Sequence, residues 1–175
     1  LPAAPPELAR EGRNPPAVFV LSPPRAGSTL LRVMLGGHPR LFAPPELELL
    51  SFHTLAGRRD AFAGRNRFWL EGALRALVQV RGWSPEEARE RMAAWEDEGL
   101  STRRFYRLLQ EWIGERVLVD KTPSYALDPA VLRQAEAGFD GARYLHLVRH
   151  PAASVLSFEE ARLDHVLEDQ RRGER

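Results

Sequence analysis

The stretch from Val18 to Leu35 constrains the fold most, because it runs from an apolar strand through a short Pro/Gly turn into an amphipathic helix. Its first four residues are apolar, as in a buried strand of a parallel sheet. Further along, apolar residues recur at helical spacing. A strand that turns directly into such a helix is typical of an α/β fold.

The turn inside this stretch has the composition of an anion-binding site. Backbone amides from about Ala26 to Thr29 stand at a helix N-terminus, where they and the helix dipole stabilise an anion. Gly27 lets the anion approach the backbone, and Arg25 adds a positive charge. Ser28 and Thr29 add hydroxyl donors. We therefore predict that these five residues bind a phosphate; a tight turn without a ligand is the alternative.

This turn departs from the nucleotide P-loop, Gly-x-x-x-x-Gly-Lys-Ser/Thr, at two positions. Ser22 replaces the first glycine, and Ser28 stands where the lysine that reaches the β- and γ-phosphates belongs. The loop is expected to hold a 5′-phosphate but lacks the group that γ-phosphoryl transfer requires. A P-loop nucleotide kinase is an alternative that the missing lysine disfavours.

Length and composition narrow the class of protein. With 175 residues, 43% apolar content and a net charge of +1, the chain can bury one core and gives no electrostatic argument for nucleic acid. The absence of cysteine excludes disulfides and thiolate metal sites, and no ligand cluster suggests a metal. No apolar run approaches the roughly 20 residues of a membrane span, and no signal peptide begins the chain. We expect a cytoplasmic protein without a membrane or nucleic-acid partner.

Residues 1–16 contain five prolines, a composition typical of an extended interdomain linker. Residues 17–175 are expected to form the domain. Residues 68–80 carry a one-sided apolar stripe that predicts a helix, and residues 84–98 begin with a capping box that predicts another. No pattern decides residues 49–60.

Two further strands are predicted at residues 117–120 and 143–148. Three strands separated by helices indicate a P-loop-like parallel sheet flanked by helices. In such sheets ligands bind beyond the carboxyl ends of the strands. Because Arg25, Lys121 and Arg149 each follow a strand, we expect one crevice to receive all three.

Arg149 and Ser157 are eight residues apart and suggest a second phosphate site. The alternative is that Arg149 pairs with an acidic residue and that Ser157 bonds to its own helix. Together with the loop at residues 25–29, two anion sites for one ligand are the favoured interpretation.

These motifs resemble those of the sulfotransferase family, whose donor is 3′-phosphoadenosine 5′-phosphosulfate (PAPS). The family's 5′-phosphosulfate loop, Pro-Arg/Lys-Ser-Gly-Ser/Thr-Thr-Leu-Leu, is matched by residues 24–31 with Ala26 in place of serine. Its 3′-phosphate motif, Arg-Asp/His-Pro with a serine eight residues on, is matched at Arg149 and Ser157, and its Asp/Glu-Lys-Thr/Ser-Pro element at residues 120–123. The resemblance implies a sulfotransferase fold that binds PAPS and releases 3′,5′-ADP.

Residues 44–47, 119–125 and 144–151 also resemble the sulfotransferase domains of modular polyketide synthases that form terminal alkenes, the olefin synthase type. This likeness implies that the acceptor is the β-hydroxyl of an acyl chain on acyl carrier protein, with neighbouring synthase domains as partners. The family usually continues well beyond the second phosphate motif, so we expect the C-terminal part of the domain to be missing. A non-catalytic docking domain that keeps the fold is a further alternative.

Sulfuryl transfer to a hydroxyl needs a base that removes the acceptor's proton. Glu46 is the candidate, because its position 21 residues after Arg25 resembles that of the catalytic glutamate in Golgi-type members of the family. Arg25 and Lys121 are expected to stabilise the charge on the moving group. His53 and His38 are lesser candidates for the base, and a helix cap is the alternative role for Glu46.

Overall fold

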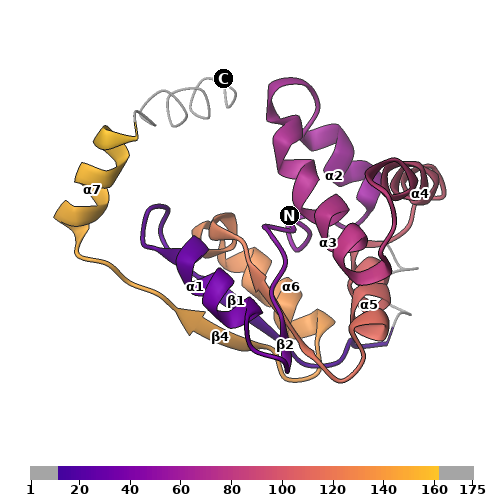
Figure 1. Ribbon diagram of the computed structural model, residues 1–175, viewed down its shortest axis with the longest axis horizontal. Helices are drawn as coiled ribbons and strands as arrows, with labels where there is room; N and C mark the ends of the chain where they lie inside the picture. The colour runs from indigo at the N-terminus through magenta and orange to yellow at the C-terminus, as the bar shows by residue number, and fades with distance from the viewer. Residues whose placement is uncertain (1–11, 162–175) are drawn as a thin grey trace.

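A computed structural model describes residues 12–161 of the chain and contains a four-stranded parallel sheet (Figure 1). The strand order is β2-β3-β1-β4. Strand β1 pairs with β3 and with β4, and β2 pairs with β3. The strands are β1 (Ala17–Leu21), β2 (Leu41–Phe42), β3 (Val117–Lys121) and β4 (Arg143–His146). Because all four are parallel, their carboxyl ends lie along one edge, where α/β folds bind ligands.

Helices connect the strands. The α-helices are α1 (Ser28–Gly36), α2 (Leu55–Ala61), α3 (Glu71–Arg81), α4 (Pro85–Asp97), α5 (Thr102–Ile113), α6 (Pro129–Gly138) and α7 (Pro151–Glu160). Two 3₁₀ helices, η2 (Gly64–Leu70) and η3 (Pro123–Leu127), complete the order. Figure 1 shows α2 to α5 gathered on one side of the molecule and α7 on the other, beyond β4. Within residues 12–161 no helix is long and apolar enough to cross a membrane.

Alternating residues of the strands face two apolar clusters, as the two-residue period of a strand requires. On one face Phe19 and Leu118 pack in the main core with the aromatic residues of α5, and the Phe19 ring lies 5.1 Å from the ring of Phe139. On the other face Val20 and Val119 pack in a smaller cluster with residues of α1. The sheet is therefore covered by α1 on one face and by α5 and α6 on the other.

The predicted parallel α/β fold is confirmed, with corrections to individual elements. The prediction of three strands was incomplete, because residues 41–42 form a fourth strand, β2, which pairs with β3. The predicted helix at 68–80 begins later, at Glu71, because residues 64–70 form η2. The last strand ends at His146 rather than at residue 148. The undecided stretch at 49–60 contains α2.

Helix caps follow the sequence closely. Ser84 and Glu87 form the predicted capping box at the start of α4. Ser101 caps α5 by accepting a hydrogen bond from the backbone amide of Arg104. Asp128 does the same for α6. These side chains satisfy amides that the first turn of a helix leaves without a partner.

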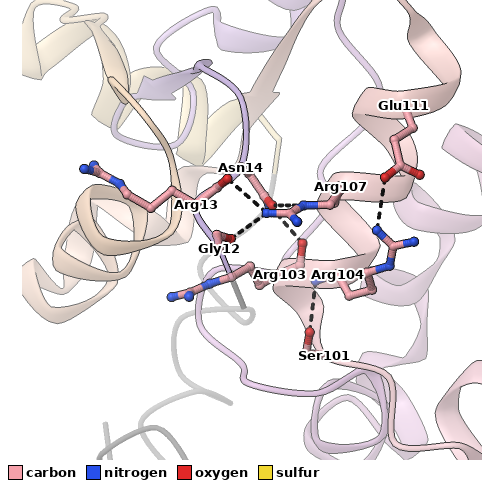
Figure 2. A network of polar contacts seen from close by, with 8 residues as sticks. All are labelled: Gly12, Arg13, Asn14, Ser101, Arg103, Arg104, Arg107 and Glu111. Atoms are coloured by element: carbon pink, nitrogen blue, oxygen red, sulfur yellow. Dashed lines mark hydrogen bonds and ion pairs between the residues drawn. The ribbon is translucent and has the colours of Figure 1, made fainter. Parts of the chain in front are cut away.

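The end of the proline-rich leader is held by α5 and α6 (Figure 2). Asn14 is fully buried, and its amide donates to the carbonyl of Gly138 at 2.8 Å. Arg107 donates to the carbonyls of Gly12 and Arg13 and, at 3.0 Å, to the side chain of Asn14. The described end of the leader therefore joins the face of the sheet that α1 does not cover.

Candidate active site

The predicted phosphate loop forms a tight turn between β1 and α1. Gly27 has φ +91°, which favours glycine, and a side chain added there would meet nothing within 4 Å. The amide of Leu31 donates to the carbonyl of Gly27 at 3.1 Å, so the helical hydrogen bonds begin there and the amides of Ser28 and Thr29 precede them. Amides that precede the first hydrogen bond of a helix suit an anion.

The second predicted phosphate motif meets this loop. Arg149 donates to the backbone carbonyl of Arg25 at 2.8 Å. The guanidinium of Arg25 in turn donates to the hydroxyl of Ser157 at 3.1 Å. Residues from the loop, from the segment after β4 and from α7 therefore form one cluster, which we call the arginine cluster. Within residues 12–161, Arg149 makes this bond to a backbone carbonyl and forms no ion pair with an acidic residue.

Glu46 and Lys121, the predicted catalytic carboxylate and ammonium, form an ion pair. The side chain of Lys121 is 1% exposed and that of Glu46 is 31% exposed, so the pair is reached from the Glu46 side. Lys121 is the only lysine in the sequence, although arginine is abundant. A compact ammonium at a buried position is not interchangeable with a guanidinium.

The register of the sheet relates this ion pair to the arginine cluster. Lys121 lies beside Val20 in the pairing of β3 with β1, and Leu21 lies beside His146 in the pairing with β4. By strand alternation Lys121 points to the face that α1 covers, where the phosphate loop begins its helix. Both groups of residues therefore lie at the carboxyl edge of the sheet, separated by one strand end.

Two residues in the site have unusual backbone conformations. Among residues 12–161, Arg25 and Glu48 are the non-glycine residues with positive φ, at 62° and 49°. Such conformations cost energy and concentrate at functional sites. One belongs to the phosphate loop and the other to the segment that carries Glu46.

The segment that carries Glu46 is held closely from two helices. Gly72 in α3 faces its backbone, and a Cβ at that position would lie 1.8 Å from the carbonyl oxygen of Glu46. The buried guanidinium of Arg58 in α2 donates to the carbonyls of Leu47 and Glu48 at 3.1 and 3.0 Å. These contacts leave the segment little freedom.

Asp120, next to Lys121, is fully buried on the opposite face of β3. It accepts hydrogen bonds from the hydroxyls of Tyr106 at 2.5 Å, Thr122 at 2.8 Å and Tyr125 at 3.1 Å. Burial raises the pKa of Asp120, and these three hydrogen bonds oppose that shift. Burial also raises the pKa of both tyrosines, which keeps their hydroxyl protons available for donation.

Glu48 is a second carboxyl group near Glu46. Its side chain accepts a hydrogen bond from the hydroxyl of Ser124 at 2.8 Å. Burial raises the pKa of Glu48 from 4.5 to about 7, and the hydrogen bond from Ser124 opposes the shift. Glu48 therefore titrates near neutral pH beside a predicted catalytic group.

The two histidines considered as bases lie elsewhere. His53 lines a cavity of about 40 Å³ together with Tyr106 and Phe139, on the face of the sheet that α5 covers. His38 follows the C-terminal end of α1, the end remote from the phosphate loop. Of the carboxylate and the two histidines, the structure brings Glu46 to Lys121.

Buried hydroxyls give a test of whether the site fits a phosphorylated donor. Within residues 12–161, the hydroxyl oxygens of Ser22 and Ser154 are buried and have no hydrogen-bond partner. Ser22 directly follows β1, and Ser154 lies one turn before Ser157 on α7. Each serine stands three positions along the chain from a residue of the arginine cluster, where an unsatisfied hydroxyl fits an anionic ligand. In the same residues no cluster of His, Asp or Glu is placed to hold a metal ion.

Sequence reasoning missed the supports of Glu46. Nothing in the pattern distinguished Arg58 from other arginines, and Gly72 looked like an ordinary helical residue. Tyr125 stood inside the quoted motif at 119–125, but the two backbone amides that donate to its hydroxyl come from a distant segment. The one signal in the sequence is that two glutamates, Glu46 and Glu48, stand two positions apart in this segment.

Comparison with known proteins gives the family of the chain. The profile of the sulfotransferase family matches residues 16–164. The structure is similar to the sulfotransferase domain of the olefin synthase from Synechococcus PCC 7002, with a TM-score of 0.84 and 42% identity over 90% of this chain and 57% of that one. It is also similar to a sulfotransferase domain from the curacin biosynthetic pathway, with a TM-score of 0.82 and 38% identity over 90% of this chain and 55% of that one.

The chain thus spans just over half the length of these solved domains. A search of curated protein sequences gave no match. The predicted likeness to sulfotransferase domains of the olefin synthase type is confirmed. On the strength of the matched residues and of this likeness, the chain belongs to the sulfotransferase family.

Proposed function

We propose that the chain carries the donor-binding and catalytic residues of a sulfotransferase that moves a sulfuryl group from PAPS to a hydroxyl acceptor. The observation that carries this proposal is the meeting of Arg25, Arg149 and Ser157 at the sheet edge that also holds the Glu46–Lys121 pair. The two predicted anion-binding motifs are far apart in sequence but lie next to each other at this edge. A nucleotide with phosphates at both its 5′ and 3′ positions would need both motifs within its length.

In this proposal the loop from Arg25 to Thr29 binds the 5′-phosphosulfate through its amides and hydroxyls. Arg149 and Ser157 bind the 3′-phosphate. In the structure these groups bond to one another, and the donor's phosphates would replace those contacts. The side chains of Arg25 and Arg149 are exposed, so they can rearrange at little cost.

Lys121 and Glu46 serve the transfer step. The acceptor oxygen forms a bond to sulfur while the bond from sulfur to the 5′-phosphate oxygen breaks, and the departing phosphate keeps the electron pair. Glu46 takes the acceptor's proton, a contribution of about 10²- to 10⁴-fold. Lys121 stabilises the negative charge on the moving group and holds the Glu46 carboxylate in place.

The acceptor that we propose is the β-hydroxyl of an acyl chain on acyl carrier protein. Support comes from the similarity to domains named for an olefin synthase and for the curacin biosynthetic pathway. Neighbouring synthase domains would then be the partners of this chain. The test is mass spectrometry of a β-hydroxyacyl carrier protein incubated with PAPS and the protein, which we expect to show the mass of one added sulfuryl group.

Calorimetry with 3′,5′-ADP tests donor binding separately. We expect binding that the Arg149→Ala variant weakens about tenfold to a hundredfold, because charge-assisted hydrogen bonds are lost. Magnesium-dependent ATP turnover would instead favour a nucleotide kinase. Unchanged sulfation by Glu46→Ala and Arg25→Ala variants would favour a non-catalytic role for this chain.

A further inference from the structure

The segment that presents Glu46 has no regular structure of its own. Residues 46–50 lie between β2 and α2, outside any helix or strand. The backbone hydrogen bonds of a helix or a strand therefore do not fix the position of Glu46. Its position must therefore come from bonds that other parts of the protein make to it.

The stretch from the end of β3 into η3 makes these bonds in sequence order. Lys121 binds the carboxylate of Glu46. Three residues later, Ser124 donates to the carboxyl group of Glu48 at 2.8 Å. The two stretches therefore run alongside each other in the same direction.

Tyr125 makes the next contact, and it is to the backbone. Its hydroxyl accepts hydrogen bonds from the amides of Leu49 at 2.8 Å and Leu50 at 3.2 Å. It donates its own proton to Asp120 at 3.1 Å. A tyrosine hydroxyl has one proton to donate and two lone pairs to accept with, so these three bonds use its full capacity. Asp120, which also accepts from Tyr106, sets the direction of that proton.

We propose that Tyr125, oriented by Asp120, is a positioning residue that holds residues 46–50 so that the Glu46 carboxylate lies against Lys121. The inference rests on the proposed function only where it assigns a catalytic consequence. Tyr125 is fully buried and stands four residues after Lys121, so one short stretch both supplies the ammonium and fixes the carboxylate opposite it.

The three tyrosines of the sequence provide a matched test. Tyr125→Phe keeps the ring and removes the acceptor of two amides. Tyr144→Phe is the control, because Tyr144 also loses one hydrogen bond, at 2.7 Å to Glu136, but does not touch the segment. Tyr106→Phe removes a buried hydroxyl that donates to Asp120 and contacts Tyr125, but does not bond to the segment. It controls for the loss of a buried hydroxyl.

The first measurement is amide hydrogen exchange on the full chain, which needs no activity. In Tyr125→Phe we expect exchange at Leu49 and Leu50 to accelerate at least about tenfold, since unpaired buried amides open more readily. Tyr144→Phe should leave these amides unchanged. Exchange at Leu49 and Leu50 that is no faster in Tyr125→Phe than in Tyr144→Phe would overturn the proposal.

The second measurement separates kcat from donor binding. We expect Tyr125→Phe to lower kcat about tenfold to a hundredfold, because a displaced catalytic group loses its geometry, and to change the Kd for 3′,5′-ADP less than twofold. Normal kcat in Tyr125→Phe, or an equal loss in Tyr106→Phe and Tyr125→Phe, would overturn the positioning role while leaving the proposed function intact. A wild-type protein that binds no 3′,5′-ADP and transfers no sulfuryl group would instead overturn the proposed function, and with it the catalytic consequence assigned to Tyr125.

Discussion

The arginine cluster and the Glu46–Lys121 pair lie at the same sheet edge but are built in opposite ways. Arg25 and Arg149 are exposed. Arg149 donates a hydrogen bond to the backbone carbonyl of Arg25, and Arg25 donates one to the hydroxyl of Ser157. Lys121 is buried and Glu46 is held by a segment that helices and strands fix from several sides. The contrast suggests a division of labour: exposed groups that rearrange around a ligand, and preorganised groups that act on it.

Substitution of Lys121 should have the largest effect and fall on the rate alone. We expect Lys121→Ala to lower kcat about 10²- to 10³-fold, as loss of a group that stabilises transition-state charge does. Lys121→Arg should recover little of this, because the larger guanidinium does not fit a position that is 1% exposed. Steady-state kinetics with saturating donor measure kcat, and calorimetry checks that 3′,5′-ADP still binds. Weakened donor binding with normal kcat would contradict the account, because Lys121 would then bind the donor and not act in the transfer step.

Gly72→Ala tests how tightly the buried region is built. A methyl group there would lie 1.8 Å from the carbonyl oxygen of Glu46, so we expect a loss of about 3 kcal/mol in the free energy of unfolding. Gly36→Ala in α1 is the control, because its added methyl meets Ala43 at an ordinary 3.6 Å. Urea denaturation of both variants gives the comparison. Equal stability of the two variants would show that the segment yields easily.

Arg149→Ala should act on affinity and spare stability. We expect the Kd for 3′,5′-ADP to rise about tenfold to a hundredfold, with the free energy of unfolding within about 0.5 kcal/mol of wild type, as for exposed substitutions. Arg143→Ala, an exposed arginine on β4, is the control. Calorimetry and urea denaturation measure the two quantities. A large loss of stability would mean that the arginine cluster is structural.

Glu48→Gln should leave catalysis and affinity aside and change the pH dependence of stability. The pKa of Glu48 is raised from 4.5 to about 7, so between these pH values the folded protein holds a proton that the unfolded chain has released. The free energy of unfolding of the wild type therefore falls as pH rises through this window. The variant lacks this loss, so we expect its stability relative to wild type to improve by roughly 3 kcal/mol from pH 4 to pH 8.

Urea denaturation at several pH values checks this expectation, with Glu111→Gln as the control at an exposed ion pair. Parallel pH profiles for wild type and Glu48→Gln would show that Glu48 is not held in a desolvated site.

Sequence reasoning predicted the exposed region better than the buried one. The phosphate loop and the Arg149–Ser157 pair depend on local spacing, which the sequence displays directly. The pairing of Glu46 with Lys121 joins residues 75 positions apart, and sequence reasoning did not predict it. Gly72, Arg58 and Tyr125 act through contacts between distant segments, and no local pattern reports such contacts.

The same distinction holds in the fold. Strands β1 and β3 and the capped helices follow from periodicity and cap residues. Strand β2 has two residues, too few for a period, and forms because Leu41 and Phe42 pair with β3. The split at residue 70 lies within an unbroken apolar stripe, so periodicity alone gave no sign of η2.

A crystal structure of the protein with 3′,5′-ADP decides whether the two regions serve one nucleotide. We expect the 5′-phosphate on the amides of Gly27 to Thr29, the 3′-phosphate on Arg149 and Ser157, and the 5′-phosphate facing Lys121 with Glu46 unmoved. A nucleotide bound at one motif only, with the other motif facing away from it, would contradict the account.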